Sequence, residues 1–524
     1  MRPSFTAVAG LLVGAALVLS SCASEPEAGD QPEAATGNPA AWSATEITEE
    51  NISAAVAALP ELVTDMMEQS GVPGVSVAVV ADGESVLTEG FGVRQVGEDA
   101  KVNADTVFQI ASLSKPVGAT VVSRSVSDGV VDWEDRVREY LPDFRLNDAY
   151  PTANVTIADL YSHRSGLPFE AGDRLEDLGF GQEAILTKLR QLPLGLFRVQ
   201  YAYSNFGLTA AAEAVAAANQ TSWASLSQSQ LYDPLDMQDT SSVYADYLSA
   251  QNRATTHQRT ENGWLPGEPR DPDAQSPAGG VSSTANDMAK WMQLQLANGR
   301  FDGEELIKPE VIQLMRQPHS ISVPATDPAA RSSMYGYGIG SGVDGTGHVR
   351  WSHSGAFVLG TATAVDFLPE AGLGIVVLTN GTPYGLPEAV AASFMDIAET
   401  GAVQRDWLAA YGQAFAPLTT NPSQLANATR PTDPAPAKPL RAYTGTYRNS
   451  YFGPAELTIS DDALVMTLGP DEYRFPLTHW DGDRFSYIPT GENGLGITAI
   501  DFDLAAGTMT VENLDNHGLG TFRR

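Results

Sequence analysis

Ser112 precedes Lys115 by three positions in the segment Phe108-Gln109-Ile110-Ala111-Ser112-Leu113-Ser114-Lys115-Pro116. On a helix this spacing puts both side chains on one face, about a turn apart. A serine at a helix start lies in the positive end of the helix dipole, and a buried lysine with a lowered pKa can help activate its hydroxyl. Ser114 is adjacent to Lys115, cannot share its face and is interpreted as structural. An ordinary helix start is the competing interpretation, because Ser-x-x-Lys alone is a common spacing.

Two later segments carry further side chains suited to catalysis. A tyrosine such as Tyr203 can act as a general base if positive neighbours depress its usual pKa of about 10. Asn205, two positions on, can both donate and accept hydrogen bonds. A glycine at a strand start lets a substrate backbone approach closely, as in Trp351-Ser352-His353-Ser354-Gly355-Ala356. The competing interpretations are a loop with a buried tyrosine and a strand with a solvent-facing histidine.

In this order and at these separations, the three segments resemble those of the serine β-lactamase-like hydrolases. That superfamily includes class C β-lactamases, low-molecular-mass penicillin-binding proteins, D-aminopeptidases and related esterases. Three supporting segments agree with the resemblance, which covers roughly residues 50–400: residues 156–167, 277–287 and 335–338. The resemblance implies an α/β fold with an antiparallel sheet flanked by helices and a helical subdomain.

Carried over residue by residue, the resemblance makes Ser112 the acylated nucleophile, with Lys115 and Tyr203 as its proton-transfer partners. Asn205 then orients Lys115 and the substrate, and the backbone N–H groups of Ser112 and Ala356 form the oxyanion hole. The substrate-binding residues of the third motif are His353, Ser354 and Gly355. Penicillinases usually have lysine at the first of these positions, and a mostly neutral histidine grips a substrate carboxylate less well. Efficient β-lactam hydrolysis is therefore not expected, and His163 is interpreted as structural.

Composition excludes other functions for this 524-residue chain. Acidic residues number 64 and basic residues 31, so the net charge of −33 repels phosphate backbones and argues against nucleic-acid binding. The single cysteine cannot form an internal disulfide or a thiolate zinc site. No His-Glu-x-x-His run, Gly-x-Ser-x-Gly elbow or phosphate-binding glycine loop is present, so we expect no metal and no cofactor.

The chain divides into five predicted regions. Residues 1–21 combine Arg2 with a short apolar run, which is typical of an export signal. They end in Leu19-Ser20-Ser21-Cys22, which resembles the bacterial lipobox, so we expect lipidation at Cys22; an ordinary secretory signal is the competing interpretation. A flexible tether over 22–46 and a hydrolase domain over 47–416 follow, then a proline-rich linker over 417–439 and a small antiparallel β-barrel domain, or a sandwich, over 440–524.

These features predict a serine hydrolase, lipid-anchored to the cell membrane on its extracytoplasmic face. It would form an acyl-enzyme on Ser112 and cleave an amide of a D-amino-acid peptide or an ester. Its partners would be a small-molecule or peptide substrate and the membrane, through Cys22. The alternatives are a penicillin-binding D,D-carboxypeptidase or β-lactamase, and a non-catalytic binding module at the cell surface.

Overall fold

The computed structural model describes residues 43–524. The predicted signal, Cys22 and most of the tether lie outside these residues. Among the helices of the described part, none is both long and apolar enough to span a bilayer.

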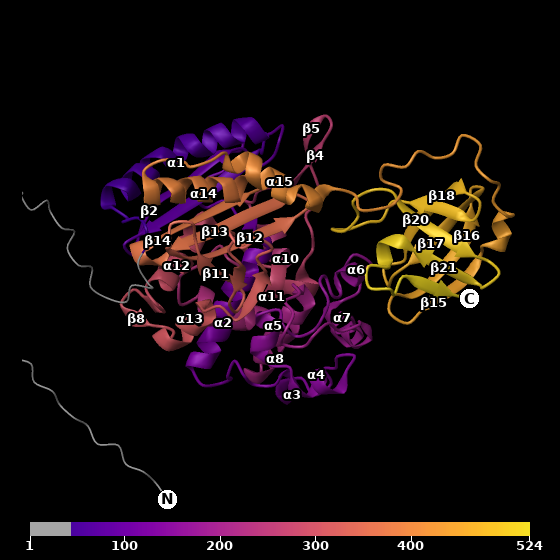
Figure 1. The fold of residues 1–524 in the computed structure, drawn as a ribbon, viewed down its shortest axis with the longest axis horizontal. Helices are drawn as coiled ribbons and strands as arrows, with labels where there is room; N and C mark the ends of the chain where they lie inside the picture. The colour runs from indigo at the N-terminus through magenta and orange to yellow at the C-terminus, as the bar shows by residue number, and fades with distance from the viewer. Residues whose placement is uncertain (1–42) are drawn as a thin grey trace, which may run out of the picture. The chain divides into compact units, whose positions relative to one another are not determined.

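An eight-stranded antiparallel sheet forms the centre of the hydrolase region (Figure 1). Its strand order is β2-β1-β14-β13-β12-β11-β10-β9. Pairing of β1 with β14, as in Val75 opposite Thr379, joins the beginning of the region to its end. The bounds are β1 Gly74–Ala81, β2 Glu84–Gly92, β9 Ser320–Val323, β10 Ser333–Tyr335, β11 Gly340–Val343, β12 Val349–Phe357, β13 Thr361–Leu368 and β14 Leu373–Thr379.

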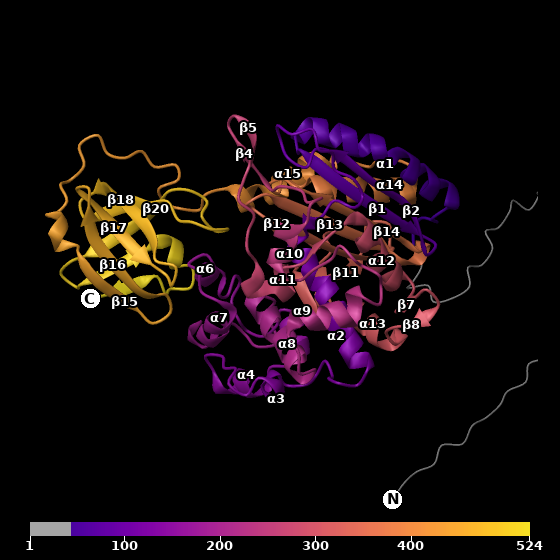
Figure 2. The same cartoon turned by 180° about the vertical axis from the view of Figure 1, so that it is seen from behind.

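Helices cover both faces of this sheet, which explains why β1 is apolar almost throughout. Val75, Val77 and Val79 belong to the core beneath α1 (Glu49–Ser70) and α14 (Leu386–Thr400). Ala78 and Val80 point the other way, into a second core that includes α12 (Ala285–Leu296). Figures 1 and 2 both show α1 and α14 on one face, together with α15 (Trp407–Thr419).

The helices of the second face include the subdomain that carries much of the site. Their bounds are α2 Ser114–Ser127, α3 Val137–Tyr140, α4 Ala149–Asn154, α5 Ile157–Tyr161, α6 Asp173–Glu176, α7 Gln182–Lys188, α8 Asn205–Ala218, α9 Trp223–Ser227, α10 Tyr244–Ser249, α11 Ser276–Gly279 and α13 Pro309–Arg316. Three two-stranded ribbons complete the region: β3 Phe108–Gln109 with β6 Ser282–Ser283, β4 His257–Thr260 with β5 Gly263–Pro266, and β7 Arg300–Phe301 with β8 Glu304–Glu305.

The C-terminal region is a closed antiparallel barrel rather than a sandwich, and pairing of Arg448 with Arg523 closes it. Its strands are β15 Gly445–Asn449, β16 Gly453–Ser460, β17 Ala463–Leu468, β18 Tyr473–Asp481, β19 Arg484–Tyr487, β20 Thr498–Asp503, β21 Thr508–Val511 and β22 Thr521–Arg523. Sequence patterns did not indicate β18, which contains Pro476, or the three-residue β22. Both form because the partner strands on either side supply the pairing that their own sequences do not announce.

The barrel is fastened to the helical subdomain by polar contacts. The Asp177 carboxylate accepts hydrogen bonds from the backbone N–H groups of Glu492 at 2.9 Å and Asn493 at 3.1 Å. Lys188 Nζ donates to the carbonyl of Tyr451 at 2.6 Å. The helix α15 continues through Pro417 to Thr419, inside the segment interpreted as the linker.

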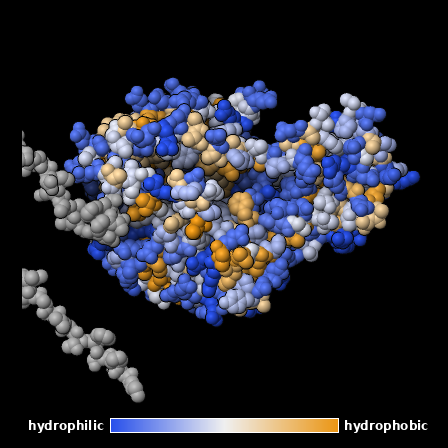
Figure 3. Space-filling model, in the orientation of Figure 1, coloured by the Kyte–Doolittle hydropathy of each residue, from blue (hydrophilic) through white to orange (hydrophobic). Residues whose placement is uncertain are grey.

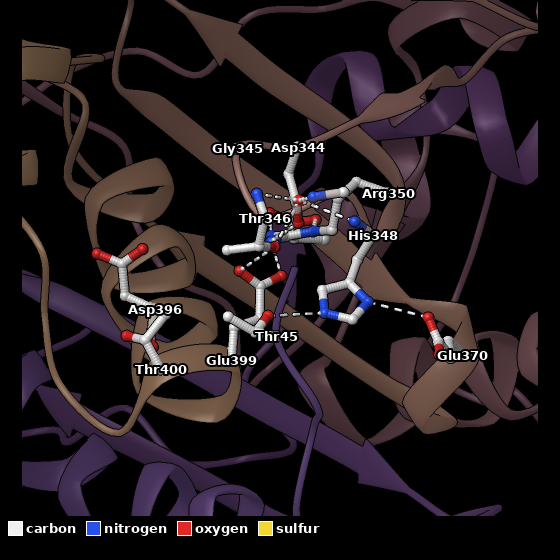
Figure 4. A network of polar contacts seen from close by, with 12 residues as sticks. Thr45, Asp344, Gly345, Thr346, His348, Arg350, Glu370, Asp396, Glu399 and Thr400 are labelled. Carbon is white, nitrogen blue, oxygen red and sulfur yellow. Dashed lines mark hydrogen bonds and ion pairs between the residues drawn. The ribbon is translucent and has the colours of Figure 1, made fainter. Parts of the chain in front are cut away.

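The first described residues pack on the hairpin between β11 and β12 (Figure 4). Ala44 N donates to Thr346 O at 2.7 Å, and Thr45 Oγ1 lies 3.0 Å from His348 Nε2. Behind this contact, the buried Arg350 guanidinium contacts three acidic side chains, those of Asp344, Asp366 and Glu399. This cluster ties the hairpin to the end of α14. On the face shown in Figure 3, hydrophilic residues predominate, with hydrophobic residues in smaller groups between them.

Candidate active site

Ser112 lies in a strained turn at the entrance to α2. We call residues 110–113 the nucleophile turn; its centre is a short 3-10 helix over Ala111–Leu113. Ala111 has φ of +48°, in the left-handed region that costs an L-residue about 1–2 kcal/mol. Ser114 Oγ donates to Ala111 O at 2.6 Å and accepts from Val281 N at 2.9 Å, so the structure places this serine in a supporting position. These buried bonds hold the strained residue in place and leave Ser112 partly exposed.

The Lys115 side chain is buried and contacts the Ser112 hydroxyl. Its Nζ lies 3.0 Å from Ser112 Oγ and donates to Ala278 O at 2.8 Å. Burial lowers the pKa of Lys115 well below its usual value; the Arg270 charge lowers it further, while Asp173 opposes the shift. A neutral amine at this distance can accept the serine proton, which a protonated lysine cannot do.

Tyr203 faces Lys115 but does not have the depressed pKa expected from the sequence. Lys115 Nζ lies 4.5 Å from the centroid of the Tyr203 ring. Burial raises the pKa of Tyr203 well above its ordinary value, although a hydrogen bond from the neighbouring Ser112 side chain opposes the rise. The direction of this shift is opposite to the one that a phenolate base would need. Tyr203 is a neutral phenol that can donate a proton or pass one on.

Asn205 begins α8, where Ser204 caps the helix by accepting from Gly207 N at 3.0 Å. Within the described structure its side-chain hydrogen bond goes to Asp173, with Nδ2 3.0 Å from Oδ2, and not to Lys115 as expected. Asp173 opens the short helix α6 and is buried. Sequence reasoning missed Asp173, because no local pattern distinguishes it from the other acidic residues of the segment 170–177.

His353 has a partner at each ring nitrogen. Nδ1 lies 2.7 Å from Ser354 O, a carbonyl that can only accept, so Nδ1 carries the proton. Nε2 is then the acceptor for the Tyr335 hydroxyl at 2.8 Å. Burial, with the Lys115 charge as a second cause, lowers the pKa of His353 to about 3. The imidazole is consequently neutral, and its hydrogen-bonding atoms are engaged within the protein.

Gly355 allows β12 to lie directly against the nucleophile turn. A Cβ at this position would come within 2.5 Å of Ile110 O and 3.0 Å of Ser112 N. Pairing of β12 with β11 ends at Ser352, whereas pairing with β13 continues to Phe357. The stretch 353–357 that contains Ala356 therefore passes beside Ser112 with one edge not taken by β11. The absence of a side chain at Gly355 allows the backbone of the nucleophile turn to lie against β12. From the sequence, this glycine was expected to allow a substrate backbone to approach.

Strand alternation puts Ser354 on the face of β12 opposite His353. Ser354 is exposed, and a hydrogen bond between its side chain and the buried Glu388 is one of the influences on the pKa of that carboxyl. His163 is buried beneath Tyr203, with 4.5 Å between the ring centroids, and its Nδ1 accepts from Ser204 N at 3.2 Å. Its contacts fix the loop that carries Tyr203, so the structure places it in a supporting position.

Together these features define a β-lactamase-like serine hydrolase: a helix-flanked antiparallel sheet with a serine–lysine pair beside one strand. A family model described as beta-lactamase matches residues 59–399, and the chain belongs to this family. The family and the fold predicted from the sequence are thereby confirmed. A second model, described as a domain of unknown function, matches residues 429–516 and covers most of the barrel.

Curated relatives are distant but extend over much of the chain. An unguisins hydrolase of Aspergillus campestris is 26% identical over 76% of this chain and 76% of its own length. Penicillin-binding protein 4 of Amycolatopsis lactamdurans is 28% identical over 59% of this chain and 81% of its own. The D-alanyl-D-alanine-carboxypeptidase/endopeptidase AmpH of Escherichia coli K12 is 26% identical over 46% of this chain and 63% of its own length.

Among solved structures, the octameric penicillin-binding protein homologue from Pyrococcus abyssi has a similar fold. The TM-score is 0.59 at 18% identity, and the match covers 87% of this chain and 98% of that one. At this identity the likeness concerns the fold alone.

Proposed function

We propose that this chain hydrolyses an ester, or an amide of a D-amino-acid peptide, through an acyl-enzyme on Ser112. The observation that carries the proposal is the 3.0 Å contact between Ser112 Oγ and Lys115 Nζ, with the lysine buried and its pKa lowered. A free amine beside a serine is the activating arrangement that acyl transfer needs at neutral pH.

In the proposed reaction, Lys115 accepts the proton of Ser112 as Oγ attacks the substrate carbonyl. The backbone N–H groups of Ser112 and Ala356 stabilise the developing oxyanion, as the closeness of β12 to the nucleophile turn supports. Tyr203, a neutral phenol over Lys115, passes the proton held by Lys115 to the leaving group, which leaves Lys115 neutral again. Water then attacks the acyl-enzyme while Lys115 accepts its proton, and Lys115 returns that proton to Oγ as the acyl bond breaks, so Ser112 is regenerated.

His353 supports substrates without a carboxylate next to the scissile bond. A neutral imidazole whose Nδ1–H is already donated to Ser354 O offers a carboxylate neither charge nor a free donor. Arg270, a nearby cation that could bind a carboxylate, is already paired with Glu176. Esters and interior amides therefore fit better than β-lactams or the free C-terminus of a D-Ala-D-Ala peptide. The names of two relatives, AmpH and penicillin-binding protein 4, favour a penicillin-binding carboxypeptidase as the second candidate.

The test combines labelling with a substrate panel. Wild type should react with a fluorophosphonate probe, with the adduct on Ser112, and Ser112→Ala should lose both labelling and turnover with its circular dichroism unchanged. The panel contains chromogenic esters, D-amino-acid anilides, D-Ala-D-Ala peptides and a chromogenic cephalosporin. Turnover of the carboxylate-bearing substrates alone would favour the second candidate. Absence of labelling and of all turnover would favour a binding module.

We also propose that the enzyme is held on the extracytoplasmic face of the membrane by a lipid on Cys22. The apolar run and the lipobox-like Leu19–Cys22 support this. Expressed in a lipoprotein-processing bacterium, wild type should carry a lipid mass at Cys22, and Cys22→Ala should be unprocessed or released. A mature N-terminus elsewhere without lipid would contradict the anchor.

A further inference from the structure

The reaction proposed above leaves one buried acid in the site without a role. Asp173 is 6% exposed and lies close enough that its ionised form would raise the pKa of both Lys115 and Tyr203. An ionised carboxylate this deeply buried is costly unless cations or several hydrogen bonds satisfy it. The hydrogen bonds of Asp173 are therefore informative.

Asp173 and Asn205 share one hydrogen bond and leave one oxygen each without a partner. Asn205 Nδ2 donates to Asp173 Oδ2 at 3.0 Å. Asp173 Oδ1 and Asn205 Oδ1 are both buried and have no hydrogen-bond partner among the described residues. Both are acceptors in the ionised state of the acid, so neither can satisfy the other. A proton on Asp173 Oδ1 would turn that atom from an acceptor into a donor.

No salt bridge to Asp173 is found among the described residues, although Arg270 and Arg174 lie near it, and Arg174 is paired with Glu170. Arg270 binds Glu176 and lies 4.0 Å from Glu492, so its charge is already shared by two carboxylates. The titratable and charged groups that face Asp173 are Glu170, Arg174 and Glu176 from its own segment, with Lys115, Tyr203, Arg270 and Tyr451 from the elements around it. Burial and the Glu176 charge raise the pKa of Asp173 to about 7, although Arg270 opposes this.

We infer that Asp173 is a neutral carboxylic acid that holds the Asn205 amide by two hydrogen bonds. The acid O–H donates to Asn205 Oδ1, and Asn205 Nδ2 donates to the acid carbonyl. Asp173 is thus a positioning residue, which acts on the substrate through Asn205. The second hydrogen of Asn205 Nδ2 remains for an acceptor such as the carbonyl oxygen of a substrate amide.

The effect of Asp173 on catalysis rests on the proposed function, the acyl-enzyme reaction on Ser112. A protonated Asp173 carries no negative charge. It therefore does not raise the pKa of Lys115, and the lysine can act as a base. When Asp173 loses its proton above about pH 7, two acceptor oxygens remain in the buried pair and the Asn205 amide loses one of its two bonds. Activity should consequently fall on the alkaline side.

The test compares Asp173→Asn with Asp173→Ala in the full chain, using the pH profile of kcat/KM for a chromogenic ester. Asparagine is neutral at every pH and supplies both an N–H and an oxygen to Asn205. It should retain kcat/KM within about threefold at pH 6 and lose the alkaline fall, whereas alanine should lose at least about tenfold, as expected for a missing buried hydrogen bond. Equal impairment of both variants, or an alkaline fall that persists in Asp173→Asn, would overturn the inference.

An infrared measurement separates this inference from the proposed function. The wild-type spectrum at pH 6 should contain a protonated carboxylic-acid band that is missing from folded Asp173→Asn; identical carboxylic-acid bands would refute a neutral Asp173. Fluorophosphonate labelling of wild type tests Ser112 independently. A protein that shows the band but no labelling would refute the proposed function while leaving the protonation of Asp173 supported.

Discussion

Gly355→Ala tests whether catalysis depends on the approach of β12 to the nucleophile turn. The added Cβ would lie 2.3 Å from Thr363 Oγ1 and 2.5 Å from Ile110 O, where ordinary contacts begin at 3.4 Å. Rotation of Thr363 cannot relieve the second contact, because Ile110 O is a backbone atom. The strand and the turn must therefore separate by about 1 Å, a displacement that typically costs on the order of 100-fold in rate when catalytic groups move.

Moving β12 away from the nucleophile turn should also lower the free energy of unfolding of Gly355→Ala, but not enough to unfold the protein. Overpacking by one methyl group costs about 1–3 kcal/mol, so the variant should remain folded. Gly342→Ala is the matched control: it lies on β11 of the same sheet, and its Cβ would meet nothing within 4 Å. We expect the control to stay within about 0.5 kcal/mol of wild type.

The assay measures kcat/KM for a chromogenic ester, the rate of fluorophosphonate labelling at Ser112, and thermal unfolding. Gly355→Ala should lose about two orders of magnitude in both rates, while Gly342→Ala should be close to wild type in all three measurements. A folded Gly355→Ala variant with the wild-type rate would show that the contact between β12 and Ser112 does not position the oxyanion hole.

Three further predictions follow from individual side chains. Ser114→Ala removes the buried bonds to Ala111 O and Val281 N and should lower the free energy of unfolding by about 1–3 kcal/mol, yet mass spectrometry should still find the probe on Ser112. Burial and a hydrogen bond with Asp344 raise the pKa of Glu399 to about 8. Because the folded state holds this proton more tightly than the unfolded state, the group contributes its full stabilisation below its unfolded pKa of about 4.3. That contribution to the free energy of unfolding is lost as the pH rises through 8. Glu399→Gln should accordingly reduce the alkaline loss of stability in denaturant titrations, and parallel curves for the two proteins would contradict the shift. His353→Lys should raise kcat/KM for carboxylate-bearing substrates relative to esters. If the wild type hydrolyses a cephalosporin at a rate near that of a dedicated β-lactamase, our interpretation of His353 is wrong.

Several elements of the fold could be predicted because their causes are local. The helical spacing of apolar residues and the terminating Gly71 mark α1, and Thr48 caps its first turn. Likewise, Asp82-Gly83 forms the turn between β1 and β2, with both residues at positive φ. The strand β18 was missed because Pro476 in its middle disfavours a strand, and it forms because β17 and β19 pair with it on either side.

The sequence by itself determined the family, the order of the three motifs and the serine–lysine spacing, because a helix converts a separation of three residues into one shared face. Tertiary structure decided the chemistry of the individual groups. Burial lowers the pKa of Lys115 but raises that of Tyr203, and Asp173 meets Asn205 across 32 residues of sequence. Gly355 meets Ile110 and Ser112 from a strand more than two hundred positions away. Solvent exclusion and the pairing of distant polar atoms exist only once the chain is folded, so no local spacing encodes them.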